Sequence, residues 1–423
     1  MATFMRTDNE ITVRIALIEF IFSKADEPQI SYGAACLKAA FDASKHKMPD
    51  DTIKILSYNL EVFKTGGAYD INRPVLLGKI WEDLQSFRPT VIAFSVFAWS
   101  DSLVREMGAQ LPTQRSGDKP FVLLGGPMIC GDESELQNKY PFGDCFVISY
   151  GEKVFSNLRA YINSQPVVHD SPALSDLHSP YLLGVIPVRQ GMAVRMETHR
   201  GCSYRCPFCR HSGGMNTIQA VGTEQRFREE LVLFRDNNIS KINVLNPLFN
   251  NKEDYKVLLD LVKELHIEIP LSVQIRCEAL TDDFLHTIKE VPNIICEIGV
   301  QSLSPSVCQE IGRNPEKTLQ GLRELQRNSI NCEVSLIYGL PRQNFQDFEQ
   351  DIRQLKEMGI SKISAFPLQI YPGTKFFQEQ EKLPLRFKPN TLGILEVDQT
   401  QDFQRMKALA EKMTSCAKNT PPL

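Results

Sequence analysis

Three cysteines close together in the chain are the residues best suited to carry chemistry. Cys202, Cys206 and Cys209 follow the pattern C-x3-C-x2-C. Gly201 allows the backbone to turn sharply into this segment, and Pro207 removes one amide hydrogen from it. A loop this short can point three sulfur atoms into one concave space. Three thiolates there can hold three irons of an iron–sulfur cluster and leave the fourth iron open.

Zinc is the alternative occupant of such a loop. Structural zinc normally takes four protein ligands, so a zinc site would need one more side chain. His199 and His211 flank the loop and could supply it. Loop solvation is the simpler role for both histidines, and the spacing alone leaves the two metal sites open.

The other cysteines predict no disulfide framework. The chain has 11 cysteines, an odd number, and its first residues do not resemble a secretion signal. Most of the remaining thiols lie in apolar, strand-like runs, where free cysteine packs as a small hydrophobic side chain. We therefore expect a reducing, cytoplasmic location.

The composition is that of an ordinary globular protein. The chain has 423 residues, 42% hydrophobic and 23% charged, with a formal net charge of −4. A general nucleic-acid or anionic-membrane binder needs a concentrated basic surface, so we expect neither partner. Apolar runs are also too short to span a bilayer.

The elements that position these residues fall into two α/β series. Residues 1–163 alternate apolar strand-like runs with helical segments, which predicts a Rossmann-like parallel sheet covered on both faces. Ligands bind such sheets at the carboxyl ends of the strands. The candidate residues at these ends are Ser95, Trp99, Gly125, Gly126, Gly151 and Glu152. The glycines could equally be turn residues, and Trp99 could simply pack.

A second series begins after a proline- and serine-rich segment at 164–192, which we interpret as a linker. Residues 193–380 contain six strand-like runs, each followed by a helix or turn, which predicts a partial (βα)6 barrel. The cysteine loop follows its first strand. Polar residues near the other strand ends should face the same space: Asn246, Arg276, Glu278, Glu297, Gln301 and Tyr338. Residues 381–423 contain one helical segment, at 400–417, and we expect them to form a short helical C-terminal cap.

With these motifs in this order, the chain resembles the cobalamin-binding radical S-adenosylmethionine (SAM) family. Besides the cysteine loop, the segments EIGVQS (297–302), LIYGLP (336–341) and IYPGT (370–374) resemble that family's barrel. SVFAWS, LLGGP and YGE resemble the strand ends of its cobalamin domain. The resemblance covers about residues 12 to 415.

The resemblance implies three cofactors and a set of residues for each. Cys202, Cys206 and Cys209 would hold a 4Fe-4S cluster whose open iron binds SAM. The implied SAM contacts are Phe208, Glu297, Gln301 and Gly339. Cobalamin would lie at the strand ends named above for the first domain.

The chain departs from the family pattern at three places. The cobalt-ligating D-x-H-x-x-G motif is absent. The glycine-glycine-glutamate after the second barrel strand is replaced by the segment from Asn246 to Asn250. One glycine of the usual G-E-G-E is Ser149. The first departure argues against histidine ligation of cobalt and does not exclude cobalamin. The third would weaken the cobalamin site, and the second affects the SAM amino-group contacts.

The resemblance implies an enzyme that cleaves SAM reductively and modifies an unactivated carbon, by methyl transfer in the main hypothesis. A second hypothesis is cyclisation, rearrangement or oxidation without methyl transfer. A third makes the first domain a substrate or partner platform without cobalamin. A fourth is a non-enzymatic iron–sulfur or zinc protein that senses redox state or docks a partner. The implied partners are a small-molecule or peptide substrate and a low-potential electron donor such as flavodoxin or ferredoxin.

Overall fold

The computed structural model describes residues 12–66, 70–111, 119–162, 167–170, 174–212, 218–251, 255–390, 393–398 and 400–418. The chain divides into two compact units. Unit 1 is built mainly from residues 1–173 and 177–187, and unit 2 mainly from residues 188–390 and 394–423. Parts of the expected linker, at 164–166 and 171–173, lie outside the described residues.

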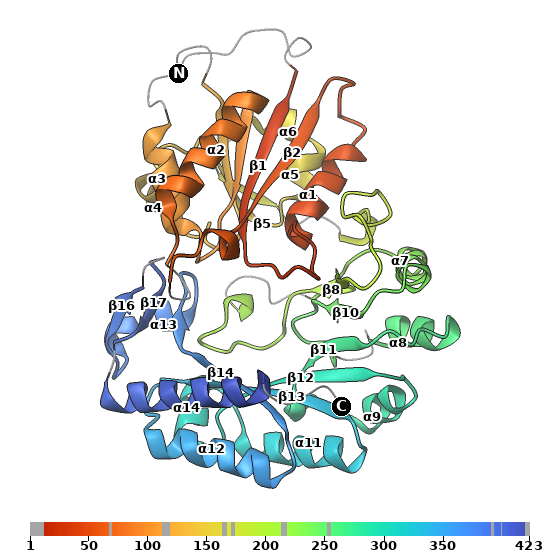
Figure 1. The fold of residues 1–423 in the computed structure, drawn as a ribbon, viewed down its shortest axis with the longest axis vertical. Coiled ribbons are helices and arrows are strands. Elements are labelled where there is room, and N and C mark those ends of the chain that lie inside the picture. The colour runs from red at the N-terminus through yellow and green to blue at the C-terminus, as the bar shows by residue number, and fades with distance from the viewer. Residues whose placement is uncertain are drawn as a thin grey trace. The chain divides into compact units, whose positions relative to one another are not determined.

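Unit 1 contains a six-stranded parallel sheet in the order β2-β1-β3-β4-β5-β6 (Figure 1). The strands are β1 (Arg14–Ile21), β2 (Thr52–Asn59), β3 (Val91–Ser95), β4 (Phe121–Gly125), β5 (Cys145–Ser149) and β6 (Val167–Asp170). This order places a topological switch point between β1 and β3, where doubly wound sheets bind ligands. The Rossmann-like sheet is therefore confirmed. The edge strand β6, only four residues long, lies in the segment that we expected to be linker.

Helices cover both faces of this sheet, which is why its strands are apolar on both sides. One face packs against α2, α3 and α4, and the other packs against α1, α5 and α6. The bounds are α1 (Tyr32–Asp42), α2 (Arg73–Phe87), α3 (Asp101–Gln110), α4 (Glu133–Lys139), α5 (Glu152–Ser156) and α6 (Leu158–Ile162).

Unit 2 contains a second six-stranded parallel sheet, in the order β14-β13-β12-β11-β10-β7. Its strands are β7 (Ala193–Met196), β10 (Lys241–Val244), β11 (Leu271–Ile275), β12 (Ile294–Gln301), β13 (Asn331–Tyr338) and β14 (Lys362–Pro367). In the part of the chain that the structure describes, β7 and β14 are not paired, so the barrel is open, as the six βα units predict.

Helices alternate with these strands along the chain. They are α7 (Glu224–Asp236), α8 (Tyr255–Glu264), α9 (Asp282–Lys289), α10 (Pro305–Ile311), α11 (Pro315–Arg327) and α12 (Phe345–Glu357). Along β12 and β13 every second side chain is buried and the intervening ones are partly exposed. The buried set includes Cys296 and Cys332, which pair across the two strands. The other set lines the open inner face of the sheet.

The C-terminal region contains the expected helix, as α14 (Gln401–Lys418). Phe403 on α14 packs against Tyr338 at the end of β13, with 5.2 Å between ring centroids. A small antiparallel sheet also forms, in the order β15-β17-β16, which the sequence did not predict. Its strands are β15 (Gln369–Ile370), β16 (Phe387–Pro389) and β17 (Leu395–Val397); α13 (Lys375–Gln378) precedes β16.

The scattered cysteines behave as predicted where the structure describes them. Cys36, Cys145, Cys277, Cys296, Cys308 and Cys332 are buried free thiols, and Cys130 is half-buried and free. None of the helices among the described residues combines the length and the apolar composition that crossing a bilayer requires.

Candidate functional site

The cysteine loop lies beyond β7, between β8 (His199–Arg200) and a 3-10 turn at Arg210–Ser212. β8 pairs with β9 (Gln219–Ala220), which closes the segment into a hairpin-like excursion. Gly201 has a φ of +96°, a value that L side chains rarely adopt, so the turn into the loop requires glycine. The three cysteines are free and partly exposed, and the amide of Cys209 donates to the carbonyl of Cys206 at 3.0 Å.

Asn246, which follows β10, fixes the entry to the loop. Its Oδ1 accepts from the amides of Thr198 (3.0 Å) and His199 (3.3 Å), and its Nδ2 donates to Thr198 Oγ1 at 2.7 Å. The same Nδ2 lies 2.9 Å from Nδ1 of His199, whose Nε2 lies 2.9 Å from the carbonyl oxygen of Leu248. Both ring nitrogens of His199 are thus engaged inside the protein, which disfavours this histidine as a fourth zinc ligand.

Positively charged side chains lie near the thiols of the loop. Among the described residues, no group of three or more His, Cys, Asp and Glu side chains is arranged to hold a metal ion. Burial raises the pKa of Cys202, while Arg276 and Arg313 act in the opposite direction. Cationic side chains are therefore positioned to stabilise anionic sulfur.

Arg276, directly after β11, brings that positive charge to the loop. Its Nη1 donates to Sγ of Cys206 at 3.6 Å, and its guanidinium carbon lies 3.7 Å from the ring centroid of Tyr204. Glu278 accepts from Arg276 Nη2 (3.1 Å) and from Arg313 Nη1 (3.2 Å). Burial raises the pKa of Glu278, but Arg313 and Arg276 outweigh it, so the pKa is lowered overall. The cysteine loop thus has a buried group with one excess positive charge beside it.

The four predicted SAM contacts come from three segments of unit 2: the cysteine loop, β12 and the turn after β13. Phe208 is half-buried within the cysteine loop. Gln301 ends β12 at a bulge, with a φ of +69°, and its amide fills the space beside Gly299. Glu297 lies four residues earlier on the same inner face, where Ser272 donates to it at 2.5 Å.

Glu297 is therefore a mid-strand residue, about 13 Å before the end of β12 at 3.3 Å per residue. Gly339, after β13, has a φ of +82°, and a Cβ there would lie 2.9 Å from the ring of Phe403. The local structure accounts for this glycine by its backbone conformation and its packing. A SAM contact for these residues remains a prediction.

The residues predicted to contact cobalamin gather at the carboxyl edge of the unit 1 sheet. Ser95 pairs with Gly125 at the ends of β3 and β4. A Cβ on Gly126 would lie 2.8 Å from the backbone of Val96, and Gly126 has a φ of +102°. This edge also includes Gly151 and the buried Glu152, which begin α5. These residues therefore share one edge of the sheet, and cobalamin binding there remains a prediction.

The contacts of Trp99 and the backbone of Ser149 describe how this edge is packed within the protein. Trp99 donates from Nε1 to the carbonyl of Phe20 at 2.7 Å and stacks on Phe97 at 4.6 Å, which supports its interpretation as a packing residue. Ser149, which stands where the family has glycine, has a φ of +96°. The backbone therefore keeps the conformation that favours glycine although the side chain has changed.

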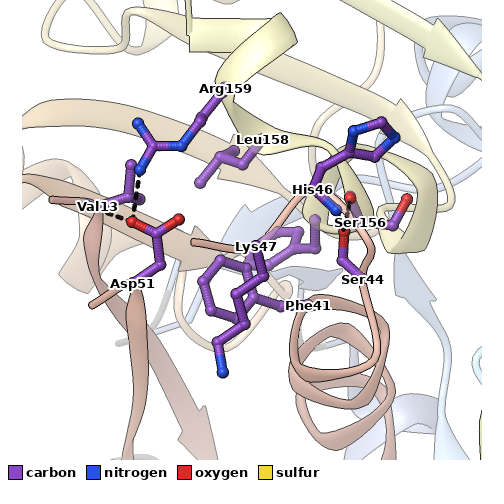
Figure 2. A pocket seen from close by; sticks show the side chains of 10 residues that line it. Val13, Phe41, Ser44, His46, Lys47, Asp51, Ser156, Leu158 and Arg159 are labelled. Atoms are coloured by element: carbon purple, nitrogen blue, oxygen red, sulfur yellow. Dashed lines mark hydrogen bonds and ion pairs between the residues drawn. The ribbon is translucent and has the colours of Figure 1, made fainter. Parts of the chain in front are cut away.

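A small pocket in unit 1 lies at the opposite edge of the sheet (Figure 2). Asp51, just before β2, accepts from the amide of Val13 (2.8 Å) and from Arg159 (2.6 Å). These bonds close the amino-terminal end of the sheet. The pocket is therefore separate from the edge where ligands of doubly wound sheets bind.

Sequence reasoning missed three residues of the site. Arg313 follows the left-handed Gly312 that ends α10, and no motif marks it. Tyr204 lies inside the cysteine motif, so its position could have drawn attention. Asn250 brackets the backbone of Arg276, accepting from its amide at 3.0 Å and donating to its carbonyl at 2.9 Å.

Comparisons with known proteins agree with this geometry. Residues 196–355 match the radical SAM superfamily model. The chain is 24% identical over 339 residues to the cobalamin-dependent radical SAM methyltransferase TokK of Streptomyces tokunonensis, covering 70% of this chain and 49% of TokK. The chain thus spans about half the length of curated relatives such as TokK.

Two solved structures share the fold across nearly the whole chain. The cobalamin-dependent SAM radical enzyme OxsB superposes with a TM-score of 0.68 at 14% identity, covering 96% of this chain and 67% of OxsB. The radical SAM methyltransferase TsrM of Kitasatospora setae gives a TM-score of 0.68 at 12% identity, covering 97% of this chain and 90% of TsrM. Residues 196–355, which include the cysteine loop after β7, are thus similar to the radical SAM superfamily, and the chain as a whole shares the fold of OxsB and TsrM.

Proposed function

We propose that this chain is an enzyme that cleaves SAM reductively at a 4Fe-4S cluster and transfers a methyl group to an unactivated carbon. The observation that carries the proposal is the trio of free thiols Cys202, Cys206 and Cys209 at the carboxyl end of the first strand of an open six-stranded sheet. When bound, the cluster supplies the low-potential electron that breaks a carbon–sulfur bond of SAM.

The chain's own residues hold and shield that reaction. Asn246 fixes the start of the loop, and the amide of Phe376 on α13 donates to the carbonyl of Pro207 within the loop. Arg276 compensates the negative charge of the sulfur ligands. We assign Cys202, Cys206 and Cys209 as cluster ligands, and Phe208 and Gln301 as the predicted SAM contacts that lie at the loop and at a strand end.

Cobalamin is the proposed methyl carrier, held at the carboxyl edge of the unit 1 sheet. The support is that β3, β4 and β5 end together there, with Ser95, Gly125, Gly126, Gly151 and Glu152. TokK and OxsB, which the chain resembles, are cobalamin-dependent enzymes. We propose a small-molecule substrate first and a peptide second, a flavodoxin or ferredoxin as electron donor, and a cytoplasmic location that keeps the thiols reduced.

The test is anaerobic reconstitution with iron, sulfide and hydroxocobalamin, followed by mass spectrometry of SAM products under strong reductant. We expect both 5′-deoxyadenosine and S-adenosylhomocysteine, together with bound cobalamin. Alanine at Cys202, Cys206 or Cys209 should remove the cluster and both products. Alanine at Cys130, a half-buried free thiol outside the loop, is the matched control and should keep them. A cluster that does not respond to SAM would contradict the proposal and favour a redox or docking protein.

A second candidate is a radical SAM enzyme that acts without methyl transfer or without cobalamin. Ser149 favours it, because a side chain at a φ of +96° adds both strain and bulk at the edge where cobalamin would lie. This candidate predicts 5′-deoxyadenosine without S-adenosylhomocysteine, and loss of hydroxocobalamin on gel filtration.

A further inference from the structure

The buried charge group beside the cysteine loop has more positive charge than its own pairing requires. Arg276 and Arg313 share one carboxylate, that of Glu278, and all three side chains are at most 10% exposed. The Nε atoms of both arginines are buried without a hydrogen-bond partner among the described residues. Burying a guanidinium without full compensation costs free energy, so the excess charge needs a second anion nearby.

The contacts of Arg276 indicate where a second anion would lie. Arg276 Nη1 is 3.6 Å from Sγ of Cys206, the middle cysteine of the loop. Its guanidinium also lies on the face of Tyr204, two residues before that cysteine, and its Nη2 donates to the carbonyl of Gly312 at 3.2 Å. The contacts with Tyr204, Gly312 and Glu278, from three segments, therefore hold one orientation, which directs an N–H group at the sulfur.

The backbone of Arg276 is fixed as firmly as its side chain. Asn250, itself 5% exposed, satisfies both the amide and the carbonyl of Arg276 with its side-chain amide. Rotation of the guanidinium away from Cys206 would break the stack on Tyr204 and the bonds to Glu278 and Gly312. The arrangement is therefore preorganised before any cofactor binds.

We propose that Arg276 is a positioning residue that raises the reduction potential of the cluster held by Cys206, and that Glu278 partly offsets this effect. This inference rests on the proposed cluster. Reduction adds one electron from an external low-potential donor and changes no protein bond, so the cluster becomes more negative by one elementary charge. A nearby cation and an N–H···S hydrogen bond both stabilise the reduced form and raise the potential. A carboxylate at the same place destabilises the reduced form and lowers the potential.

Removing the cation and removing the anion should shift the reduction potential of the cluster in opposite directions. Arg276→Met removes the cation and the hydrogen bond, and should lower the reduction equilibrium constant at least tenfold, which is 59 mV for one electron. Glu278→Gln removes the anion and should shift the potential upward. Arg276→Lys keeps the charge but loses the planar fork, so its shift should lie between those of the wild type and Arg276→Met.

The measurement is a potentiometric titration of the reconstituted cluster, followed by electron paramagnetic resonance, in the absence of SAM. Arg228→Gln is the control, since Arg228 on α7 pairs with Glu264 on α8 at 2.6 Å and with Glu224 on its own helix, away from the cysteine loop. Its potential should match that of the wild type. Iron content is measured for every variant.

The outcomes separate this inference from the proposed function. Failure of the wild-type chain to take up a cluster would overturn the proposed function. A wild-type cluster with equal potentials in all variants, or with Arg276→Met and Glu278→Gln shifted in the same direction, would overturn only the role of Arg276. If Arg276→Met lost its cluster, the directions in which Glu278→Gln and Arg276→Lys shift the reduction potential would decide whether Arg276 has this role.

Discussion

The side-chain amide of Asn246 lies 2.9 Å from Nδ1 of His199, and the same amide group contacts Thr198. This relationship joins the end of β10 to the segment that leads into Cys202. The bonded atoms are buried, since Asn246 is 0% and His199 2% exposed. The residue that replaces the family's glycine-rich segment thus supports the loop through its side chain.

Replacing Asn246 should release the loop. Asn246→Leu keeps the volume but leaves buried donors and acceptors of Thr198 and His199 unpaired, at a cost of about 1 to 3 kcal/mol for each such group. We expect a fall of about 2 to 4 kcal/mol in the free energy of unfolding and less iron bound after reconstitution. Thermal and denaturant unfolding of the metal-free protein and an iron assay measure both.

Asn243, on the partly exposed face of β10, provides the matched control. Its Nδ2 donates a long hydrogen bond, 3.4 Å, to the carbonyl of Val194. Asn243→Leu should change stability by less than about 1 kcal/mol, because its polar group is not fully buried. Equal losses in the two variants would contradict the support that we assign to Asn246.

Ser149→Gly should stabilise unit 1. At a φ of +96° a serine side chain strains the backbone, and glycine relieves that strain although it adds entropy to the unfolded chain. The net gain should be about 1 kcal/mol, measured as a higher denaturant midpoint with an unchanged slope. Ser306→Gly, at an exposed helical position in α10, should instead lose about 0.5 kcal/mol. A loss at both positions would show that Ser149 is not strained.

Much of this architecture follows from pattern alone. A long apolar run such as β1 indicates a parallel sheet because both faces of the strand are buried, and a helix follows each run. The position of the cysteine loop after the first strand follows from the same alternation. These features are local in sequence, so residue types and spacing are sufficient to predict them.

Features that depend on distant partners were not predictable. β15 and β17 are two and three residues long, and pair Gln369 with Glu396 across an intervening helix. Arg313 reaches the site only because α10 ends at Gly312 and turns the chain toward Glu278. Glu297 was expected near a strand end, but it lies in the middle of β12, four residues before Gln301.

Asp351 should make the stability of unit 2 depend on pH. It lies buried on α12, where Ser302 Oγ donates to it at 2.7 Å, and burial raises its pKa from 3.8 to about 6. Between these two values the folded chain binds more protons than the unfolded chain. Stability contributed by the protonated form is therefore present below pH 3.8 and is lost as pH rises through about 6.

The size of this effect is up to about 3 kcal/mol, since one pKa unit corresponds to about 1.4 kcal/mol. The side chain introduced by Asp351→Asn cannot ionise, so the free energy of unfolding of this variant should lack the contribution that Asp351 makes. Subtracting its unfolding free energies from those of the wild type, at intervals from pH 4 to pH 7, isolates the contribution of Asp351. The difference should become less favourable to the wild type as pH rises, and a flat difference would contradict the raised pKa.

Gly126→Ala tests whether the carboxyl edge of the unit 1 sheet tolerates a side chain. An added Cβ would lie 2.8 Å from both the amide nitrogen and the carbonyl oxygen of Val96, and a φ of +102° disfavours alanine. Because backbone atoms cannot move aside cheaply, we expect a loss of about 2 kcal/mol or more, by denaturant unfolding.

Gly33→Ala is the opposite case in the same unit. Gly33 lies in α1, and an added Cβ there meets nothing within 4 Å. Alanine in a helix is favoured over glycine by about 0.5 to 1 kcal/mol, so this variant should be more stable than the wild type. Hydroxocobalamin retained by each variant on gel filtration then separates stability from binding. Gly33→Ala should retain as much cobalamin as the wild type, whereas Gly126→Ala should retain less, because β3 and β4 can no longer close together at the proposed cobalamin edge.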